Sequence, residues 1–287
     1  MTNHPSKNRN TLEGMRAAVD AELERLLPAG RSRLFEAMRY AVLGGGKRFR
    51  PLVLLAFGEA FGAERPLLLP YACAIELIHN YSLVHDDLPA MDDDDVRRGR
   101  PSCHKAFGEG PALLAGDGLL SLAFEVLAGA PYPRRRPGAK NAALREIASA
   151  AGVRGMIEGQ WLDIRPGPEA KTADGFLDMI SKKTGALIRA SAMSGALLAG
   201  APAKGAAAAL DYGTALGLAF QLRDDLADAG RSGSPSGIDA VSVFGRESAR
   251  ACLESCLTEA RAALERGGIA STELRLLAAS LEPGEGM

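Results

Sequence analysis

Residues 68–95 read LLPYACAIELIHNYSLVHDDLPAMDDDD, in which an apolar stretch runs directly into a cluster of aspartates. The apolar part predicts a long, largely buried helix. Pro89 removes a backbone donor where this helix would continue, so the helix must bend or end there. Such a break would bring Asp86 and Asp92 together across a turn, although they are six residues apart in the chain.

The few polar side chains of this helix converge on one face. At about 100° per residue, His79 falls roughly 20° from Asp86, and Ser82 falls roughly 40° from it. A lone histidine in an apolar helix is more often a satisfied core residue, but the face that His79 shares with Asp86 favours ligand binding. The sequence therefore predicts a polar site at the end of a buried helix.

A second acidic cluster, DDLAD at Asp224–Asp228, also lies in apolar surroundings. Asp224 and Asp228 are four residues apart, so a helix places both carboxylates on one face, while Asp225 points about 100° away. In a partly dry site such carboxylates repel one another unless hard cations with oxygen ligands neutralise them. Two acidic walls that face each other across a cavity could hold two or three Mg2+ ions and a diphosphate, with Mn2+ as a substitute for the metal.

Two alternatives stay open for the first cluster. Taken alone, a run of aspartates is more often a solvated loop or a weak calcium site than a catalytic site. Within the run, Asp93, Asp94 and Asp95 are either solvated or paired with Arg97 and Arg98, which follow them closely.

The composition favours a helical and soluble protein. Hydrophobic residues make up 47% of the 287 residues and aromatic residues only 5%, so the core is built mainly from aliphatic side chains. A formal net charge of −1 argues against nucleic-acid binding. Four cysteines without metal-site spacing predict free thiols in a reducing cytoplasm. The polar N-terminus resembles no signal peptide, and no segment reaches membrane-spanning length without a charge.

The apolar periodicity predicts an all-α fold without a competing strand pattern. We expect a flexible tail over residues 1–10, followed by a single helical domain over residues 11–287. The expected helices cover residues 12–27, 32–43, 52–61, 68–88, 111–127, 140–157, 175–199 and 206–229, with a final region over 247–281. The expected loops include residues 131–138, 165–168 and 231–237. Three glycines precede the basic segment Lys47–Arg50, which makes this turn a candidate anion cradle.

Six motifs in chain order resemble the trans-type isoprenyl diphosphate synthases (polyprenyl synthetases), in particular the bacterial short-chain branch that makes farnesyl diphosphate. The motifs are Gly45–Pro51, Asp86–Arg98, Pro101–Asp117, Gly159-Gln160 with Asp163, Lys183–Gly185 and Phe220–Asp228. The resemblance implies a bundle of ten or more helices around a deep central cavity, usually a homodimer. It also implies a magnesium-dependent head-to-tail condensation of isopentenyl diphosphate with dimethylallyl or geranyl diphosphate.

The resemblance assigns a role to each candidate residue by its place in a motif. The metal ligands are Asp86, Asp92, Asp224 and Asp228. The allylic diphosphate is bound by Arg97 and Lys183. The diphosphate of the second substrate is bound by Lys47, Arg50, His79 and Arg98. The catalytic side chains around the allyl cation are Lys183, Thr184 and Gln221.

Chain length is set, in the family that this sequence resembles, by the residues just before the first aspartate. Here these are Tyr81 and Ser82, and an aromatic residue at the first position is typical of members that make farnesyl diphosphate. Tyr81 lies about 140° from Asp86 on an ideal helical wheel, so the product rests on the resemblance. Geranylgeranyl and geranyl diphosphate stay open as alternative products.

The chain departs from the family pattern after Asp228. The family usually has lysines in the following loop. Residues 229–245 of this chain contain no lysine, and Arg231 is their single cation. The enzyme is therefore either slower, which the intact acidic clusters favour, or a regulatory subunit of a sister synthase. A terpene cyclase would share the fold. Two features argue against that class: the acidic residues of the second cluster are all aspartates, and the chain has the basic turn at Lys47.

Overall fold

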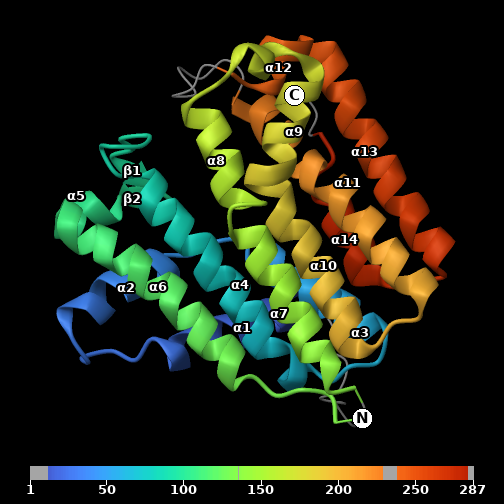
Figure 1. Cartoon of the computed structure of the whole chain (residues 1–287), viewed down its shortest axis with the longest axis horizontal. Coiled ribbons are helices and arrows are strands. Elements are labelled where there is room, and N and C mark those ends of the chain that lie inside the picture. The colour runs from blue at the N-terminus through green and yellow to red at the C-terminus, as the bar shows by residue number, and fades with distance from the viewer. Residues whose placement is uncertain (1–11, 135, 229–237, 284–287) are drawn as a thin grey trace, which may run out of the picture. The chain divides into compact units, whose positions relative to one another are not determined.

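The computed structural model describes residues 12–134, 136–228 and 238–283. Helices dominate these residues, which confirms the predicted all-α class (Figure 1). The tail predicted over residues 1–10 and the loop predicted over 231–237 lie outside the described residues.

The chain divides into two compact units. The first contains Arg65–Pro131 and the described part of Met1–Leu55, and the second contains Ala56–Glu64 and the described part of Tyr132–Met287. The boundary falls within helix α3 (Phe49–Ala60). The single domain predicted over residues 11–287 stays a prediction.

Helix α4 (Arg65–Asp86) is the central helix of the first unit, and most of its residues are buried. Helices α1 (Leu12–Leu26), α2 (Arg33–Leu43) and α6 (Glu109–Gly129) pack against it. The contact with α6 is close because Gly116 has no side chain: a Cβ there would lie 2.1 Å from His85 Nε2.

A short hairpin separates α4 from α6, although the sequence pattern predicted no strands. Strand β1 (Val96–Arg97) pairs antiparallel with β2 (Arg100–Pro101), and the short helix α5 (Cys103–Phe107) follows. Both residues of the turn, Arg98 (φ 54°) and Gly99 (φ 76°), are left-handed, as a two-residue hairpin turn with the right twist requires. Strands of two residues are too short to show an alternating pattern, so they could not be predicted from periodicity.

Helix α11 (Ala203–Asp228) is the central helix of the second unit. It packs against α10 (Ala186–Ala199) and α13 (Arg246–Gly267), and α10 also packs against α7 (Gly138–Ala151). The other elements of this unit are α8 (Met156–Ile164), the 3-10 helix η2 (Pro168–Lys171), α9 (Ala173–Ile180), the π-helix η3 (Ser181–Gly185), α12 (Ala240–Phe244) and α14 (Thr272–Ala279).

Three of the predicted helices are divided in the structure. The helix predicted over 140–157 breaks between α7 and α8, where a Cβ on Gly155 would lie 2.1 Å from the Ala150 carbonyl oxygen. The helix predicted over 175–199 contains a π-helical turn. The region predicted over 247–281 breaks at Gly268, whose φ of 66° ends α13. Helix α12, which begins at a capping box formed by Asp239 and Ser242, was not predicted.

Among the described residues, two helices, α4 and α6, are long and apolar enough to cross a membrane by length and composition alone. In α4, 67% of the apolar window is buried inside the protein, as expected for the core helix of a globular unit. In α6 this share is 33%, and its exposed face includes Asp117 and Glu125. Neither helix is assigned to a membrane on these grounds.

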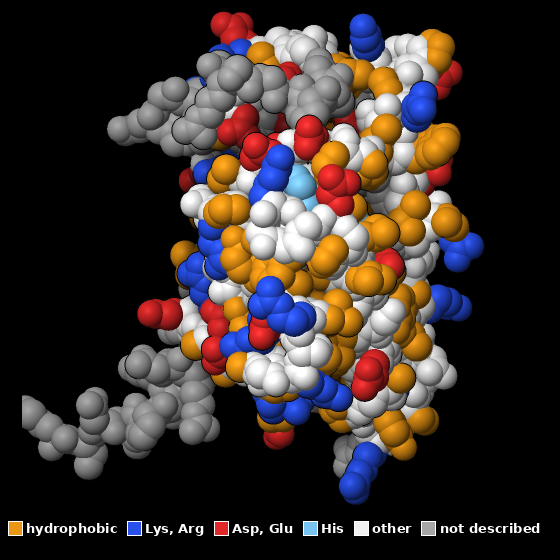
Figure 2. Space-filling model, turned by 90° about the vertical axis from the view of Figure 1, so that its left-hand side faces the viewer, with side chains coloured by type: hydrophobic (Ala, Val, Ile, Leu, Met, Phe, Trp, Pro, Cys, Tyr) orange, Lys and Arg blue, Asp and Glu red, His pale blue; other side chains and the backbone are white. Residues whose placement is uncertain are grey.

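On the face seen in Figure 2, acidic, basic and hydrophobic side chains are all exposed. The whole chain has a net charge of −1. Electrostatic attraction of an anionic ligand must therefore come from local clusters of cations.

Candidate functional site

The predicted site residues fall into two sets, one in each unit. The first unit holds Lys47, Arg50, His79, Tyr81, Ser82, Asp86, Asp92, Arg97 and Arg98. The second unit holds Lys183, Thr184, Gln221, Asp224 and Asp228.

The end of α4 forms the turn that Pro89 predicts. The helix ends at Asp86, and the backbone N–H of Asp92 donates to the carbonyl oxygen of Asp86 at 2.9 Å. The two aspartates are thus brought together across a turn, as expected from the sequence. Their carboxylate oxygens are the hard donors that Mg2+ takes, so this pair of residues fits a divalent metal.

The remaining aspartates of the first cluster have different surroundings. Asp87 is buried and accepts hydrogen bonds from Arg97 Nε, at 2.9 Å, and from Arg97 Nη2. Arg97 Nη2 also donates to Asp94 Oδ2 at 2.8 Å. Burial raises the pKa of Asp87 above its usual value, and Arg97 only partly offsets this shift. Arg97 is therefore fixed by two carboxylates at the edge of the predicted diphosphate site.

The pairing alternatives left open for Asp93–Asp95 are resolved one by one. Asp94 pairs with Arg97, and Asp95 pairs with Lys105 at 2.7 Å. Arg98 instead donates to the Gly45 carbonyl oxygen at 2.6 Å. Asp93 has neither an ion pair nor a hydrogen bond from its side chain among the described contacts.

The basic turn separates a structural arginine from an exposed lysine. Arg48 is buried and donates to Glu76 Oε1 at 2.8 Å, to Asp20 Oδ1 at 2.8 Å and to the Val42 carbonyl oxygen at 2.9 Å. It therefore ties together α1, α2 and α4 and is not available to a ligand. Lys47, by contrast, is exposed. No pattern in the sequence distinguishes these two neighbours.

Arg50 and His79 meet in the first unit, as the predicted diphosphate site requires. Arg50 Nη1 lies 3.3 Å from His79 Nε2. Burial lowers the pKa of His79 well below its usual value, and the charge of Arg50 lowers it further. A neutral imidazole can accept the hydrogen bond from Arg50, so the fixed positive charge here comes from the arginine.

The two predicted chain-length residues differ in their surroundings. The ring of Tyr81 is buried and lies edge-to-face on His85, with centroids 5.7 Å apart. Burial raises the pKa of Tyr81 to about 12, and the neighbouring Asp86 acts in the same direction. The Ser82 hydroxyl donates to the His79 carbonyl oxygen at 2.9 Å, within the helix.

A chain of hydrogen bonds fixes the polar side chains of the second unit. The Thr184 hydroxyl donates to Gln221 Oε1 at 2.7 Å, and Gln221 Nε2 donates to Asp225 Oδ1 at 2.8 Å. The backbone N–H of Ala240 donates to the other oxygen of Asp225 at 2.9 Å. Asp225 therefore joins α11 to α12, and burial raises its pKa to about 6. Sequence reasoning set Asp225 apart from the metal ligands but missed this role.

Lys183 lies in the π-helix η3, where it forms an ion pair with Asp163 of α8. π-Helical turns are rare and occur often at functional sites. Two glycines allow α8 and α11 to pack closely against this turn. A Cβ on Gly159 of α8 would lie 2.1 Å from the Lys183 backbone nitrogen, and one on Gly217 of α11 would lie 2.6 Å from Gly185 Cα. Gly159 and Asp163 were seen in the sequence only as parts of a motif.

The second acidic cluster lies in the last turn of α11, which ends at Asp228. Asp224 and Asp228 thus share one helical face, as predicted. Arg223 Nη1 lies 3.1 Å from Asp224 Oδ1. Arg231, the one cation in the first part of the following loop, lies outside the described residues.

Comparison with known proteins decides the family. The family model described as polyprenyl synthetase matches residues 31–238. The chain belongs to the polyprenyl synthetase family. Members of this family are prenyltransferases that use a divalent metal and condense isopentenyl diphosphate with allylic diphosphates, and the chain is a prenyltransferase of this kind.

Relatives and solved structures agree with the family model. The chain is 42% identical over 219 residues to a farnesyl diphosphate synthase of Geobacillus stearothermophilus. This alignment covers 76% of this chain and 74% of the relative. The chain is 46% identical over 203 residues to that of Escherichia coli K12, in an alignment that covers 70% and 68%. The crystal structure of an FPP/GFPP synthase of Zymomonas mobilis aligns with a TM-score of 0.85 at 35% identity, over 96% of this chain and 98% of the other. Geranylgeranyl diphosphate synthases also match, at 37% to 42% identity.

Proposed function

We propose that this polyprenyl synthetase makes farnesyl diphosphate from isopentenyl diphosphate and dimethylallyl or geranyl diphosphate. The observation that carries the proposal is the turn at the end of α4, which joins Asp86 and Asp92 through a backbone hydrogen bond beside Arg97, which pairs with Asp87 and Asp94. Similarity to farnesyl diphosphate synthases supports the choice of product.

The proposed metal is Mg2+, two or three ions, with Mn2+ as a substitute. The proposed ligands are Asp86, Asp92, Asp224 and Asp228. When bound, the ions would take up the negative charge of the allylic diphosphate as it leaves. Each cluster supplies the carboxylate oxygens that such ions require.

The diphosphate groups are proposed to bind to cations of two kinds. Arg97 and Lys183 would bind the allylic diphosphate. Arg97 uses Nε and Nη2 for its carboxylates, which leaves Nη1 for a phosphate oxygen. Lys47, Arg50, His79 and Arg98 would bind the diphosphate of isopentenyl diphosphate, where arginine supplies a charge that does not depend on pH.

The proposed catalytic side chains are Lys183, Thr184 and Gln221. Thr184 donates its proton to Gln221, so the lone pairs of its hydroxyl oxygen remain to face a developing allyl cation. The double bond of isopentenyl diphosphate would attack this cation, and loss of a proton would complete the longer chain. Asp163 would hold the Lys183 ammonium in position until the diphosphate arrives.

The experiment that tests the proposal incubates the purified chain with Mg2+, radiolabelled isopentenyl diphosphate and each allylic primer in turn. We expect consumption of the label with dimethylallyl and geranyl diphosphate, at a reduced rate because the loop after Asp228 lacks lysines. Binding of diphosphate without consumption of label would instead identify a regulatory subunit of a sister synthase.

Two variants test the metal assignment. Asp86→Ala and Asp224→Ala should each lower turnover by orders of magnitude, and the fold should remain intact because each removes charge from a repulsive cluster. Near-normal rates in either variant, with the substrates saturating, would contradict that assignment.

Chain length is the point at which a second candidate, geranylgeranyl diphosphate synthase, has support from the relatives. The buried ring of Tyr81, five residues before Asp86, supports the shorter product. Tyr81→Ala should lengthen the product, and Tyr81→Phe should leave it at fifteen carbons because the ring remains. An unchanged product in Tyr81→Ala would show that another residue limits growth.

A homodimer is also part of the proposal. Helix α8 exposes Ile157, Trp161 and Ile164, whose spacing places them on one helical face, and the turn before it exposes Val153. Helix α6 exposes Leu113, Leu114 and Phe124. Exposed apolar faces of this kind are typical of protein–protein contacts, and a second copy of the chain is the proposed partner. A cytoplasmic location is proposed as well, since all four cysteines are free thiols.

A further inference from the structure

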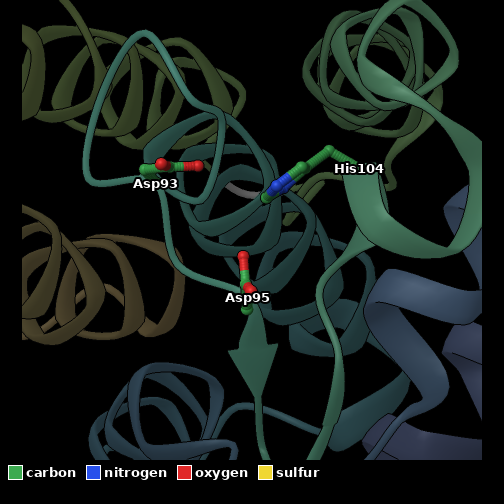
Figure 3. Close-up of side chains that lie close together, drawn as sticks. All are labelled: Asp93, Asp95 and His104. Atoms are coloured by element: carbon green, nitrogen blue, oxygen red, sulfur yellow. The ribbon is translucent and has the colours of Figure 1, made fainter.

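A second set of candidate metal ligands lies in the first unit, apart from Asp86 and Asp92. It consists of Asp93, Asp95 and His104, each of which offers one ligand atom within 4.8 Å of the other two. The aspartates come from the loop between α4 and β1, and the histidine comes from the start of α5. In Figure 3 the three side chains point toward a common centre.

His104 gives an independent reason to expect a ligand at this centre. The side chain is 95% buried, with a relative exposure of 5%, and its Nε2 atom has no hydrogen-bond partner among the described residues. A buried polar atom without a partner costs about 1–3 kcal/mol, and a bound ion is one way to satisfy it. Figure 3 shows the ring directed between the two carboxylates.

Ser102 prepares His104 to act as a ligand. The Ser102 hydroxyl lies 3.0 Å from His104 Nδ1. Ser102 occupies the N-cap position of α5, but its side chain makes no capping hydrogen bond to a backbone N–H of the helix. When the Nδ1 proton is donated to this hydroxyl, the lone pair of the ring lies on Nε2, as in most metal-binding histidines.

The two carboxylates have room for a metal. Asp95 uses Oδ1 for its ion pair with Lys105, and a carboxylate has a second oxygen and further lone pairs. Asp93 has no ion pair among the described contacts, and its side chain is exposed. Its backbone is left-handed, with φ of 53°, which aspartate tolerates better than most residues.

We propose that Asp93, Asp95 and His104 bind a divalent transition-metal ion of the Zn2+ class, with water completing its coordination. An imidazole nitrogen beside two carboxylates favours Zn2+, Co2+ or Fe2+ over Mg2+, which prefers oxygen ligands alone. The ion would join the loop after α4 to α5 and so hold in place the segment that follows Asp92. The site is separate from the proposed magnesium ligands and needs no diphosphate.

The test uses the metal-free full-length chain without any diphosphate. Co2+ is titrated with excess Mg2+ present, its visible absorption is recorded, and Zn2+ is then added as a competitor. We expect one equivalent of Co2+ to bind with the absorption of a nitrogen-ligated ion and to be displaced by Zn2+. Absence of such binding in the wild-type chain would overturn the proposal. The three side chains would then be neighbours that bind no metal ion.

Variants then locate the ion. Asp93→Asn changes an exposed residue and should lower the affinity for Co2+ at least about tenfold, as should His104→Gln. Ser102→Ala, which keeps all three ligands, should lower it about tenfold by releasing the imidazole. Asp94→Asn is the matched control, because Asp94 lies between the two ligands in sequence but pairs with Arg97, and Asp86→Ala is a second control. Both controls should keep the affinity within about threefold.

Because these variants are compared by Co2+ binding, the test of the metal site does not depend on the prenyltransferase activity. Should Asp93→Asn be folded and bind Co2+ like the wild type, the site is wrong. Loss of binding in His85→Gln with retention in His104→Gln would also overturn it, because the ion would then lie beside α6.

Discussion

At the scale of single residues, neighbours in the sequence have different tasks. Lys47 is exposed, whereas Arg48 is buried and holds three helices together. Asp86 belongs to the turn at the end of α4, whereas Asp87 is buried against Arg97. Neighbouring residues of like charge therefore do not share one role, because each role depends on the groups that the side chain contacts.

His79 illustrates how burial decides the charge of a residue. Its pKa in the folded chain lies well below the usual value near 6.5, because the imidazole is desolvated and faces Arg50, with Arg98 and Arg48 adding to the effect. Below about pH 6.5 the unfolded chain therefore binds a proton that the folded chain does not. The contribution of His79 to stability should fall as the pH falls.

We predict that His79→Gln removes this dependence. Relative to the variant, the wild type should lose up to about 1.4 kcal/mol of unfolding free energy between pH 6.5 and pH 5.5. Urea unfolding of both proteins at a series of pH values measures the difference. The two curves should run parallel above pH 7, where the histidine is neutral in both states, and parallel curves below pH 6 as well would contradict the lowered pKa.

At the scale of elements, the sequence predicted the existence of most helices but not the places where they are divided. Apolar periodicity located α1, α2, α4 and α11 within a few residues. It could not locate the π-helix, because a π turn has no periodicity of its own over five residues. The break before α8 depends on the contact of Gly155 with the Ala150 carbonyl, which only the folded chain shows.

The candidate site could be predicted to a similar degree. The turn joining Asp86 and Asp92 follows from Pro89, which is local chemistry. The pairing of Lys183 with Asp163 joins residues twenty apart across two elements, and no local pattern reports it. Sequence reasoning thus found the residue types of the site and left their partners to the structure.

The contact of α8 with the π-helix gives a prediction about elements. Gly159→Ala should destabilise the chain by about 1–3 kcal/mol, because the new Cβ would lie 2.1 Å from the Lys183 backbone nitrogen and 2.4 Å from its Cα. It should also lower activity by displacing Lys183. Urea unfolding and the condensation assay measure the two effects.

Gly167→Ala is the matched control for this variant. Gly167 has φ of −72°, which alanine adopts without strain, and a Cβ there would meet no atom within 4 Å. Its stability should be unchanged or rise by about 0.5 kcal/mol. A Gly159→Ala protein as stable and active as this control would show that α8 can move away from the π-helix at little cost.

Arg48 gives a second prediction about elements. Arg48→Met should destabilise the chain by about 3–5 kcal/mol, because it leaves Glu76 buried without its cation. The double variant Arg48→Met with Glu76→Leu should recover much of this loss, since no charge is then left buried. Lys47→Met, at the exposed neighbour, should change the unfolding free energy by less than about 0.5 kcal/mol. Equal losses in the single and double variants would show that Arg48 acts by packing alone.

At the scale of the whole molecule, the net charge is too small to attract substrates, so local groups of charged residues must bind them. A net charge of −1 attracts no anionic substrate from a distance, so binding of two diphosphates depends on the few cations that line the predicted sites. Four of these cations, Lys47, Arg50, Arg97 and Arg98, belong to the first unit, and Lys183 belongs to the second. Each unit also holds one of the two acidic clusters. Catalysis in the proposed sense therefore requires the whole chain, and neither unit holds the complete set of residues.

The exposed apolar faces of α8 and α6 lead to a prediction about assembly. Trp161 is 64% exposed and Leu114 is 59% exposed, and each helix exposes further apolar side chains, a pattern typical of protein–protein contacts. If a second copy is that partner, Trp161→Glu should weaken the dimer by about 2 kcal/mol or more, which is about 30-fold in its dissociation constant. Leu114→Glu should act in the same direction.

Light scattering on a size-exclusion column, over a range of protein concentrations, measures the mass and so the share of dimer. Leu276→Glu is the control, because Leu276 of α14 is 51% exposed but has no comparable apolar neighbours on its helix among the exposed residues. We expect the wild type and this control to have the mass of two chains, and the other two variants to approach that of one. A wild-type chain that is monomeric at every concentration would remove the dimer from the proposal, and the faces of α8 and α6 would then need a partner of another kind.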